Sequence, residues 1–317
     1  MRIVALEEHT FPRDILHAAD LDLGSRASRK ADELDDLGEG RLRTMDTAGV
    51  DIQVLSALAH IVQELEPERS VAVSRALNDR MAATVESHPD RFRAFATLPM
   101  SAPERAVTEL RRAVDELGFV GTMIHGQTNG VFLDHPSVGP VLACAEELGV
   151  PIYLHPAPPP PAVHDAYYSG LEPDIAAALA TAGWGWHAEC GMHVLRMVVG
   201  GVFERYSALR VIVGHMGEGL PFSLARADAM LSPLIRSHRA FVADTVHRNV
   251  YITTSGYTTV APLQCALTVL GADRILFSVD HPFADSAEAT SFLHSAPLSP
   301  TDRDKIAHGN AELLLGL

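Results

Sequence analysis

The sequence predicts an α/β protein built as a TIM-type (β/α)8 barrel, and three observations lead to this fold class. Eight short β-type runs recur along the 317 residues. Most are followed by a stretch whose apolar residues lie three and four apart, which is typical of an amphipathic helix. Runs such as RVIVG and RILFSV are almost continuously apolar, which indicates a parallel sheet buried on both faces. Eight such alternations favour a closed barrel, because an open sheet would leave two strand edges to protect.

The predicted elements follow one another along the chain. Strands are expected at residues 3–6, 51–55, 92–97, 120–124, 151–154, 210–214, 250–254 and 275–279. Helices are expected between them, at 68–86, 102–117, 136–148, 187–206, 220–234 and 262–270. Because the alternation continues from end to end, we interpret residues 1–317 as one domain.

Two connections, residues 10–40 and 156–184, are longer than the others, and the second begins with the proline-rich segment HPAPPPPA. Both follow the carboxyl end of a predicted strand, so they would lie over the barrel face where enzymes of this fold place their chemistry. A proline-rich segment can also mark a domain boundary, but the alternation resumes beyond it. We therefore interpret it as a stiff wall or lid of a pocket.

The composition excludes several classes of protein. The chain carries 25 Lys and Arg against 40 Asp and Glu, a formal net charge of −15, which argues against nucleic acid or an anionic membrane as partner. Apolar residues make up 47%, enough for a large core. Three scattered cysteines, the start MRIVALEEH and the lack of an apolar run of about 18 residues predict a cytoplasmic protein.

Histidine and acidic residues stand at the ends of five of the eight predicted strands, whereas chance would place such residues at about one or two of them. They are Glu7 and His9 after the first strand, His125 after the fourth, His155 after the fifth, His215 after the sixth and Asp280 after the eighth. Because the carboxyl ends of barrel strands meet at one rim, we expect these side chains to gather there.

Four of these residues could hold a metal ion. Glu7 and His9 are two residues apart, and the period of a strand places both side chains on one face. His155 and Asp280 would approach the same axis from other strands, which completes a set of two imidazoles and two carboxylates. Such a set suits Zn²⁺ or Mn²⁺ better than Ca²⁺ or Cu⁺. We therefore expect one divalent ion and no organic cofactor.

The segment VGHMGEGLPF places Glu218 three residues after His215, and Arg226 follows eight residues later. His215 could act as a general acid or base whose ring Glu218 orients. It could equally be a structural histidine at a strand-to-helix turn, with Glu218 interacting with the helix dipole. These residues alone leave both interpretations open, and the other candidates on the same rim favour the catalytic one.

Other residues are weaker candidates. Glu8 should point away from the barrel axis and form a structural salt bridge. His281, next to Asp280, either lines the pocket or packs in the core. His187 and Glu189 lie with His193 on a predicted helix, where they could form a buried network or contribute to binding.

Taken together, these motifs resemble those of the amidohydrolase superfamily, and within it the branch of nonoxidative decarboxylases such as γ-resorcylate decarboxylase and aminocarboxymuconate-semialdehyde decarboxylase. The matching segments are ALEEH at 5–9, RLRTMDTAGVDIQVLS at 41–56, PIYLHP at 151–156, GWHAECGMHVLR at 185–196, VGHMGEGLPF at 213–222 and RILFSVDHPF at 274–283. They span nearly the whole chain in order.

The resemblance implies a distorted TIM barrel with one divalent ion, a homodimer or homotetramer, and a role for each matching residue. The ligands would be Glu7, His9, His155 and Asp280. His215, Glu218 and Arg226 would be the catalytic histidine, its glutamate partner and a nearby arginine. Asp280 would serve both as ligand and as proton carrier.

The sequence departs from the dihydroxybenzoate decarboxylases at positions that face the substrate in those relatives. They tend to have asparagine where His125 stands, an arginine or similar polar group where Ala157 stands, and an aromatic residue followed by PFE where this chain reads DHPFAD. The resemblance therefore implies that His125, His281 and Phe283 contact the substrate, while the particular acid stays open.

The expected activity is decarboxylation of a hydroxylated aromatic or related unsaturated acid, in which Asp280 protonates the ring carbon that bears the carboxylate and CO₂ leaves. The alternative is hydrolysis of an ester, lactone or amide, for which the same residues would activate a water molecule. A non-catalytic metal-binding protein is the third hypothesis, and it gives no reason for a histidine–glutamate pair beside the ligands.

Overall fold

The computed structural model describes residues 1–235 and 241–317, and this part of the chain contains eight strands. They are β1 (Val4–Thr10), β2 (Ile52–Ala57), β3 (Phe92–Ala94), β4 (Thr122–His125), β5 (Ile152–His155), β6 (Val211–Val213), β7 (Val250–Thr253) and β8 (Ile275–Leu276). All neighbouring strands that pair are parallel. Each strand overlaps one predicted run, so the strand prediction is confirmed.

The strands close into a barrel. They pair in chain order as two sheets, β1 to β3 and β4 to β8. Parallel bridges join the sheets, Ala96 with Thr122 between β3 and β4, and Leu6 with Ser278 between β1 and the segment after β8. The backbone N–H of Leu6 also donates to the carbonyl of Phe277 at 3.2 Å. The fold is therefore a (β/α)8 barrel whose two irregular joins make it distorted, as predicted.

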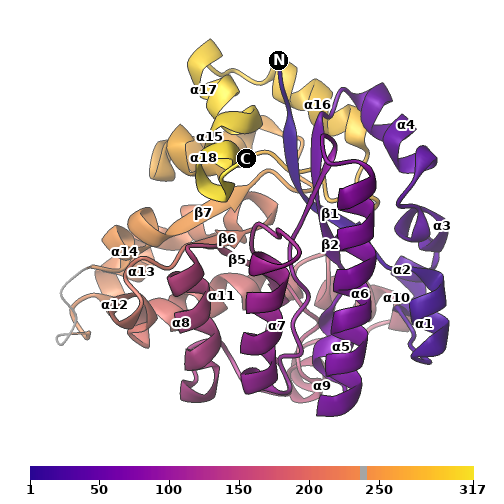
Figure 1. The fold of residues 1–317 in the computed structure, drawn as a ribbon. Coiled ribbons are helices and arrows are strands. Elements are labelled where there is room, and N and C mark those ends of the chain that lie inside the picture. Colours follow the sequence, from indigo (N-terminus) through magenta and orange to yellow (C-terminus); the bar gives the residue numbers. More distant parts are fainter. Residues whose placement is uncertain (236–240) are drawn as a thin grey trace.

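Helices surround this barrel (Figure 1). The longer ones are α4 (Glu39–Ala48), α6 (Pro67–Ser87), α7 (Pro103–Asp115), α8 (Gly139–Leu148), α11 (Gly185–Val199), α13 (Leu220–Leu231), α14 (Val242–Asn249), α15 (Val260–Leu270) and α16 (Ser286–Ser295). Shorter ones are α5 (His60–Gln63), α12 (Val202–Arg205), α17 (Pro300–Asp304) and α18 (Asn310–Leu315), with the helical turns η1 (Pro136–Val138), η2 (His215–Gly217), η3 (Ala272–Arg274) and η4 (Lys305–Gly309). None of the described helices is long and apolar enough to cross a bilayer.

One predicted helix is divided. The helix expected at 187–206 ends as α11 at Val199 and restarts as α12, because Gly200 and Gly201 interrupt it. Gly201 has φ 73°, a left-handed conformation that glycine adopts without strain and that no helix continues through.

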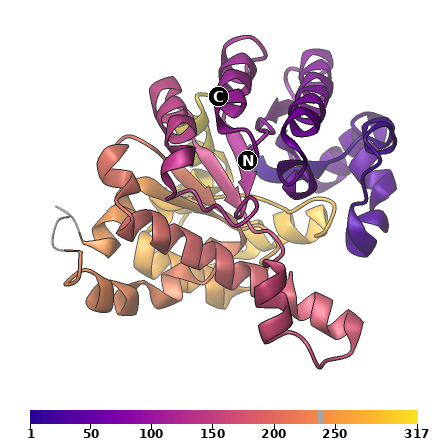
Figure 2. The same ribbon diagram turned by 90° about the horizontal axis from the view of Figure 1, so that it is seen from below.

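The two long connections are mostly helical. The first contains α1 (Arg13–Ala18), α2 (Gly24–Ser28) and α3 (Ala31–Asp35), and the second contains α9 (Pro161–Tyr167) and α10 (Pro173–Ala180). Each helix of the second connection begins with a proline, whose fixed φ suits the first helical position. Figure 2 shows α9 and α10 extending from the body of the molecule beside the amino end of α11.

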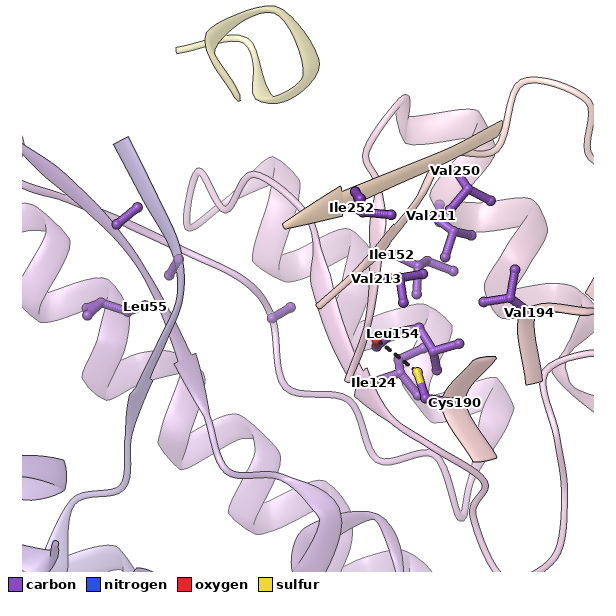
Figure 3. Packing of buried hydrophobic residues seen from close by; sticks show 14 of the residues in the cluster. Leu55, Ile124, Ile152, Leu154, Cys190, Val194, Val211, Val213, Val250 and Ile252 are labelled. Atoms are coloured by element: carbon purple, nitrogen blue, oxygen red, sulfur yellow. Dashed lines mark hydrogen bonds between the residues drawn. The ribbon is translucent and has the colours of Figure 1, made fainter. Parts of the chain in front are cut away.

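The core has two layers. Inside the barrel lie side chains that alternate along the strands, such as Val4, Leu6, Ile52 and Val54. Between the barrel and the helices lies a second layer, part of which Figure 3 shows, with Ile152, Leu154, Val211, Val213, Val250 and Ile252 facing Cys190 and Val194 of α11. Burial on both faces explains why the strands read as apolar runs.

A β-bulge in β1 breaks this alternation where the acidic and histidine residues begin. Val4 and Ala5 pair with Ile52 and Gln53, but the next paired residue is Glu8, and the register shifts between Ala5 and Glu8. Glu7 adopts φ 62° in this bulge. The extra residue reverses the facing of the strand, so Glu7 points into the barrel directly after the inward-facing Leu6.

Candidate metal centre and active site

Four side chains converge at the carboxyl end of the barrel, and all four are buried. One ligand atom from each of Glu7, His9, His155 and Asp280 lies within 4.8 Å of the others. His155 Nε2 is 3.2 Å from Glu7 Oε1, and His9 Nε2 is 3.3 Å from Asp280 Oδ1. Donors bonded to one ion at about 2.0–2.2 Å in a tetrahedral arrangement lie roughly 3.3 Å apart. The predicted ligand set thus has the spacing of a single-ion site.

Two of these donor atoms lack a hydrogen bond within the described part of the chain. Glu7 Oε1 and His9 Nε2 are buried, and neither has a hydrogen-bond partner among the described residues. Burying an unpartnered carboxylate oxygen and ring nitrogen side by side costs free energy unless a further group satisfies both. A divalent cation does so, and the residues therefore fit a metal ion.

Neighbouring groups fix the orientation of the ligands. His155 Nδ1 lies 2.6 Å from the carbonyl of Pro156, which can only accept, so Nδ1 carries the proton and Nε2 is left as the donor atom for a metal. Ser56 Oγ lies 3.2 Å from His9 Nδ1. The hydroxyl of Tyr153 donates to Glu7 Oε2 and lies 3.0 Å from Thr253 Oγ1. Each of these three ligands is thus held by a second group.

The backbone is strained around the cluster. Seven non-glycine residues of the described chain have φ between 47° and 77°, and five of them lie at this site. These five are Glu7, His215, Met216, Glu218 and Asp280. Such conformations cost about 1–3 kcal/mol each and persist where the surrounding structure holds them for function.

His215 and Glu218 lie beside the four ligands, together with His187 of α11. His215 Nδ1 is 2.7 Å from Glu218 Oε1, and His187 Nδ1 is 2.5 Å from Glu218 Oε2. His215 Nε2 faces the cluster, 3.7 Å from Glu7 Oε1 and 3.8 Å from Asp280 Oδ2. The three groups could in principle hold an ion of their own. The two short distances are those of charge-assisted hydrogen bonds, below the spacing of ligands on one ion.

Charges within the cluster shift its ionisation. Burial alone would raise the pKa of Glu7, but His215 and His155 lower it to about 2. Burial would likewise raise the pKa of Asp280, and His215 and His9 lower it. Burial disfavours the cation of His215, yet Glu7 and Glu218 raise the pKa of its imidazole well above the ordinary value. Glu7 and Asp280 are therefore ionised, the form in which carboxylates bind metal ions.

Glu8 points away from the barrel axis, as expected. Its Oε1 accepts the N–H of Val279 at 3.0 Å and its Oε2 accepts from Gln53 at 3.0 Å. Burial raises the pKa of Glu8 to about 8, against the opposing effects of the Val279 N–H and of Arg41. The buried Arg41 donates to the carbonyl of His9 at 2.5 Å. Glu8 thus ties β1 to β2 and to the segment after β8 by hydrogen bonds, and the predicted salt bridge is not among its contacts in the described chain. Arg41 holds the carbonyl of the next residue, His9.

A cavity of about 690 Å³ opens over the cluster, within the range of small-molecule sites. Asp280, His155 and His215 lie at its walls together with Phe283 and Trp186. Both long connections contribute, the first through α2 and the second through Pro156, Pro158 and residues of α10. The proline-rich segment thus forms part of a wall, as the sequence predicts.

The predicted substrate-contact residues differ in their placement. Phe283 lines the cavity. His125 is buried and is not among the cavity-lining residues. Its ring centroid is 4.4 Å from that of His155, and neither of its ring nitrogens has a partner in the described chain. His281 is buried but is not among the cavity-lining residues, and burial lowers its pKa to about 3. Arg226 is exposed on α13 and is not among the cavity-lining residues.

Three further residues of the site were not among the predicted site residues. Tyr153 is two residues before His155 on β5, so the period of a strand could have placed it on the same inner face. Arg26 lies on α2 in the first long connection, and Trp186 lies at the start of α11, directly after the second. Neither residue follows a strand, so the sequence contains no positional signal for them. Arg26 Cζ lies 5.1 Å from the ring centroid of Phe283 and 6.0 Å from that of Trp186.

Known proteins resemble this chain over its whole length. A family model described as amidohydrolase matches residues 9–317. A γ-resorcylate decarboxylase of Polaromonas sp. strain JS666 is 38% identical over 99% of this chain and 98% of that protein. The decarboxylase orsB of Emericella nidulans is 36% identical over 99% of this chain and 96% of that protein.

One solved structure with a similar fold contains a bound metal ion and an inhibitor. The crystal structure of a dihydroxybenzoic acid decarboxylase from Polaromonas sp. JS666, with bound manganese and the inhibitor 2-nitroresorcinol, has a TM-score of 0.90 and 35% identity. The match covers 100% of this chain and 97% of that chain. The resemblance drawn from the sequence motifs is confirmed by these matches.

Proposed function

The chain belongs to the amidohydrolase family, and from this premise we propose that it catalyses the metal-dependent, nonoxidative decarboxylation of a hydroxylated aromatic carboxylic acid. The observation that carries the proposal is the buried set of Glu7, His9, His155 and Asp280, of which His155 and Asp280 line a cavity of about 690 Å³. The related decarboxylases support the reaction type.

The four converging residues would hold one divalent ion. Manganese is our first choice because a related decarboxylase binds it, and zinc suits the same two nitrogen and two oxygen donors. When bound, the ion would orient the carboxylate and an adjacent phenolic oxygen of the substrate and offset their negative charge. Two carboxylate ligands already neutralise much of its charge, which suits orientation better than the generation of hydroxide.

Asp280 would carry the proton. Because Asp280 is ionised at rest, it would first take up a proton from His215, whose pKa is raised. It would then deliver this proton to the ring carbon that bears the carboxylate, so a C–H bond forms and aromaticity is lost. The bond from that carbon to the carboxylate then breaks, CO₂ leaves, and the bonding electron pair restores the aromatic ring. His215, whose Nε2 is 3.8 Å from Asp280 Oδ2, would supply the proton to Asp280, while Glu218 holds the other ring nitrogen.

Two of the predicted contact residues would position the aromatic ring. Phe283 offers a ring face in the cavity wall, which favours stacked or edge-on packing. His125 has two ring nitrogens without partners in the described chain and would bind a substrate hydroxyl or carboxylate, although it is buried and is not among the cavity-lining residues. The roles of His281 in binding and of Arg226 beside Glu218, the oligomeric state and the cytoplasmic location stay predictions.

Isotopes test the proposal and separate it from hydrolysis. The Mn²⁺- and Zn²⁺-loaded protein is incubated with a panel of hydroxybenzoates in D₂O, and CO₂ and the product are measured. We expect CO₂ together with deuterium at the vacated ring carbon. Release of acid from an ester, lactone or amide, with ¹⁸O from solvent in the product and no CO₂ from any benzoate, would establish the hydrolase instead. Asp280→Asn should abolish turnover, because the amide carries no transferable proton.

A further inference from the structure

His187 reaches the active site from a helix that the reaction above does not use. It lies on α11, and its Nδ1 is 2.5 Å from Oε2 of Glu218, on the segment after β6. Gly191, one turn further along α11, permits this approach, because a Cβ there would lie 2.6 Å from the backbone carbonyl oxygen of Glu218. The helix thus packs directly against the backbone of Glu218, and the contact between the two side chains is part of that packing.

The carboxylate of Glu218 has two imidazole partners, one on each oxygen. His215 Nδ1 is 2.7 Å from Oε1, and His187 Nδ1 is 2.5 Å from Oε2. The Glu218 side chain is fully buried, and within the described chain its ion-pair partners are these two histidines. If His187 were absent, one oxygen of a buried carboxylate would lose its hydrogen bond, and the side chain would be free to turn away from His215.

The second ring nitrogen of His187 contacts the cavity wall. Its Nε2 accepts the indole N–H of Trp186 at 3.2 Å and also lies 3.1 Å from the carbonyl of Ala182. A neutral ring accepts from Trp186 at Nε2, and a protonated ring donates from Nε2 to Ala182. In either protonation state Nδ1 donates to Glu218, so the contact with Glu218 persists.

Trp186 is the substrate-facing member of this chain of contacts. It lines the cavity, and its ring centroid lies 6.3 Å from that of His155. His187 therefore stands between a ring that would pack against the substrate and the carboxylate that orients His215.

We propose that His187 is a positioning residue that holds the Glu218 carboxylate through Nδ1 and the Trp186 indole through Nε2, so that the proton-transfer pair and the wall of the substrate cavity are fixed relative to each other. This inference rests on the proposed decarboxylation for its kinetic consequences, and its structural part stands by itself.

Two substitutions separate the two contacts. His187→Asn places an amide near the position of Nδ1 and keeps a donor for Glu218, but it lacks an acceptor for Trp186. His187→Gln places an amide oxygen near the position of Nε2 and keeps the acceptor for Trp186, but it lacks the donor for Glu218. His187→Leu removes both contacts, and His294→Asn, at an exposed residue of α16, is the matched control.

Steady-state kinetics with the fully metal-loaded protein and its best hydroxybenzoate should separate an effect on kcat from an effect on KM. His187→Gln should lower kcat about 10–100-fold with KM changed less than threefold, because a displaced proton-transfer pair slows chemistry. His187→Asn should raise KM with kcat within threefold, and His187→Leu should show both changes. Equal losses of kcat in the asparagine and glutamine variants with a common fall in Tm, or no change in any variant, would overturn the proposal.

Tryptophan fluorescence provides a readout that does not need activity. Trp184 and Trp186 are the two tryptophans of the sequence, so Trp184→Phe leaves Trp186 as the single fluorophore. In that background, His187→Asn should shift the emission of Trp186 and His187→Gln should leave it within experimental error. If wild-type protein decarboxylates no acid of the panel, the proposed function fails. Identical emission with and without His187→Asn in the Trp184→Phe background refutes the His187 contact itself.

Discussion

His155 Nε2 lies 3.2 Å from Glu7 Oε1, although the two residues come from β5 and β1. His9 and Asp280 form a second pair of the same kind at 3.3 Å. Each pair combines an imidazole with a carboxylate, and the fold brings both pairs to the same point of the barrel. The protein therefore places four donors before any ion arrives, and ion binding should be linked to the stability of this arrangement.

Metal removal should lower stability, and by more the more tightly the ion is bound. Chelation should lower the Tm, and added Mn²⁺ should restore it with a concentration dependence, since a ligand at 100 times its Kd stabilises by about 2.7 kcal/mol. Glu7→Gln should abolish this response, because the amide neither offsets the charge of the ion nor binds it well. Calorimetry with and without Mn²⁺, with metal content by mass spectrometry, checks this. A full equivalent of tightly bound metal in Glu7→Gln would contradict it.

Tyr153→Phe should weaken the metal site without disturbing the barrel core. The variant keeps the aromatic ring that packs inside the barrel near Phe95, but it loses the hydroxyl that donates to Glu7 Oε2. Loss of a group that orients a ligand typically costs about 10–100-fold in metal affinity. Metal titration of the variant measures the change, and Phe95→Leu, which alters the same core without touching a ligand, is the control. Unchanged affinity in Tyr153→Phe would show that Glu7 needs no such support.

The strands and most ligands are predictable because they depend on local patterns. Apolar runs identify strands buried on both faces, and His155 and Asp280 follow from their places at strand ends. The facing of Glu7 is different. The run predicted as a strand ended at Leu6, and ordinary alternation past that inward-facing residue would turn Glu7 outward. The bulge turns it inward, and nothing in the sequence ALEEH specifies a bulge.

The site features that the sequence could not predict depend on contacts between segments that are distant in the chain. The interaction of His187 with Glu218 depends on how closely α11 packs on the segment after β6, which Gly191 determines. The role of Arg226 beside Glu218 came from the family resemblance alone and stays a prediction, because the structure shows only that its side chain is exposed on α13. Spacing predicts shared faces within an element, but it does not predict which elements approach each other.

Arg41→Lys should destabilise the protein by about 2–4 kcal/mol. The buried Arg41 donates to the carbonyl of His9 at 2.5 Å and to that of Asp36 at 2.9 Å. The single ammonium of lysine cannot reach both acceptors in the same fork geometry, and each buried acceptor left unpaired costs about 1–3 kcal/mol. Arg43→Lys is the matched control on the same helix, because within the described chain the ion-pair partner of Arg43 is the exposed Glu39. It should change the unfolding free energy by less than about 0.5 kcal/mol. Urea unfolding of both variants measures the difference, and equal midpoints would refute the role of Arg41 in holding these carbonyls.

The buried His193 should make the protein less stable in acid. Its Nε2 accepts the N–H of Leu133 at 2.8 Å, so the folded state requires that nitrogen to be unprotonated. Burial lowers the pKa of His193 to about 3, whereas an unfolded chain has a histidine pKa of about 6.5. Between these values the unfolded state binds more protons than the folded state, so stability rises with pH and falls as pH drops below about 6.5. The contribution of His193 should approach a slope of one proton, or about 1.4 kcal/mol per pH unit, between pH 4 and 6.

His193→Gln isolates that contribution. The amide oxygen of glutamine can accept the N–H of Leu133 and does not titrate, so the unfolding free energy of the variant should fall less steeply with acid than that of the wild type. Other buried histidines, such as His125 and His281, contribute equally to both proteins and cancel in the difference. Urea unfolding at pH 4.5, 5.5, 6.5 and 7.5 measures both curves, with His294→Gln as the exposed control that should follow the wild type. Parallel curves for wild type and His193→Gln would mean that His193 is not held neutral by the fold.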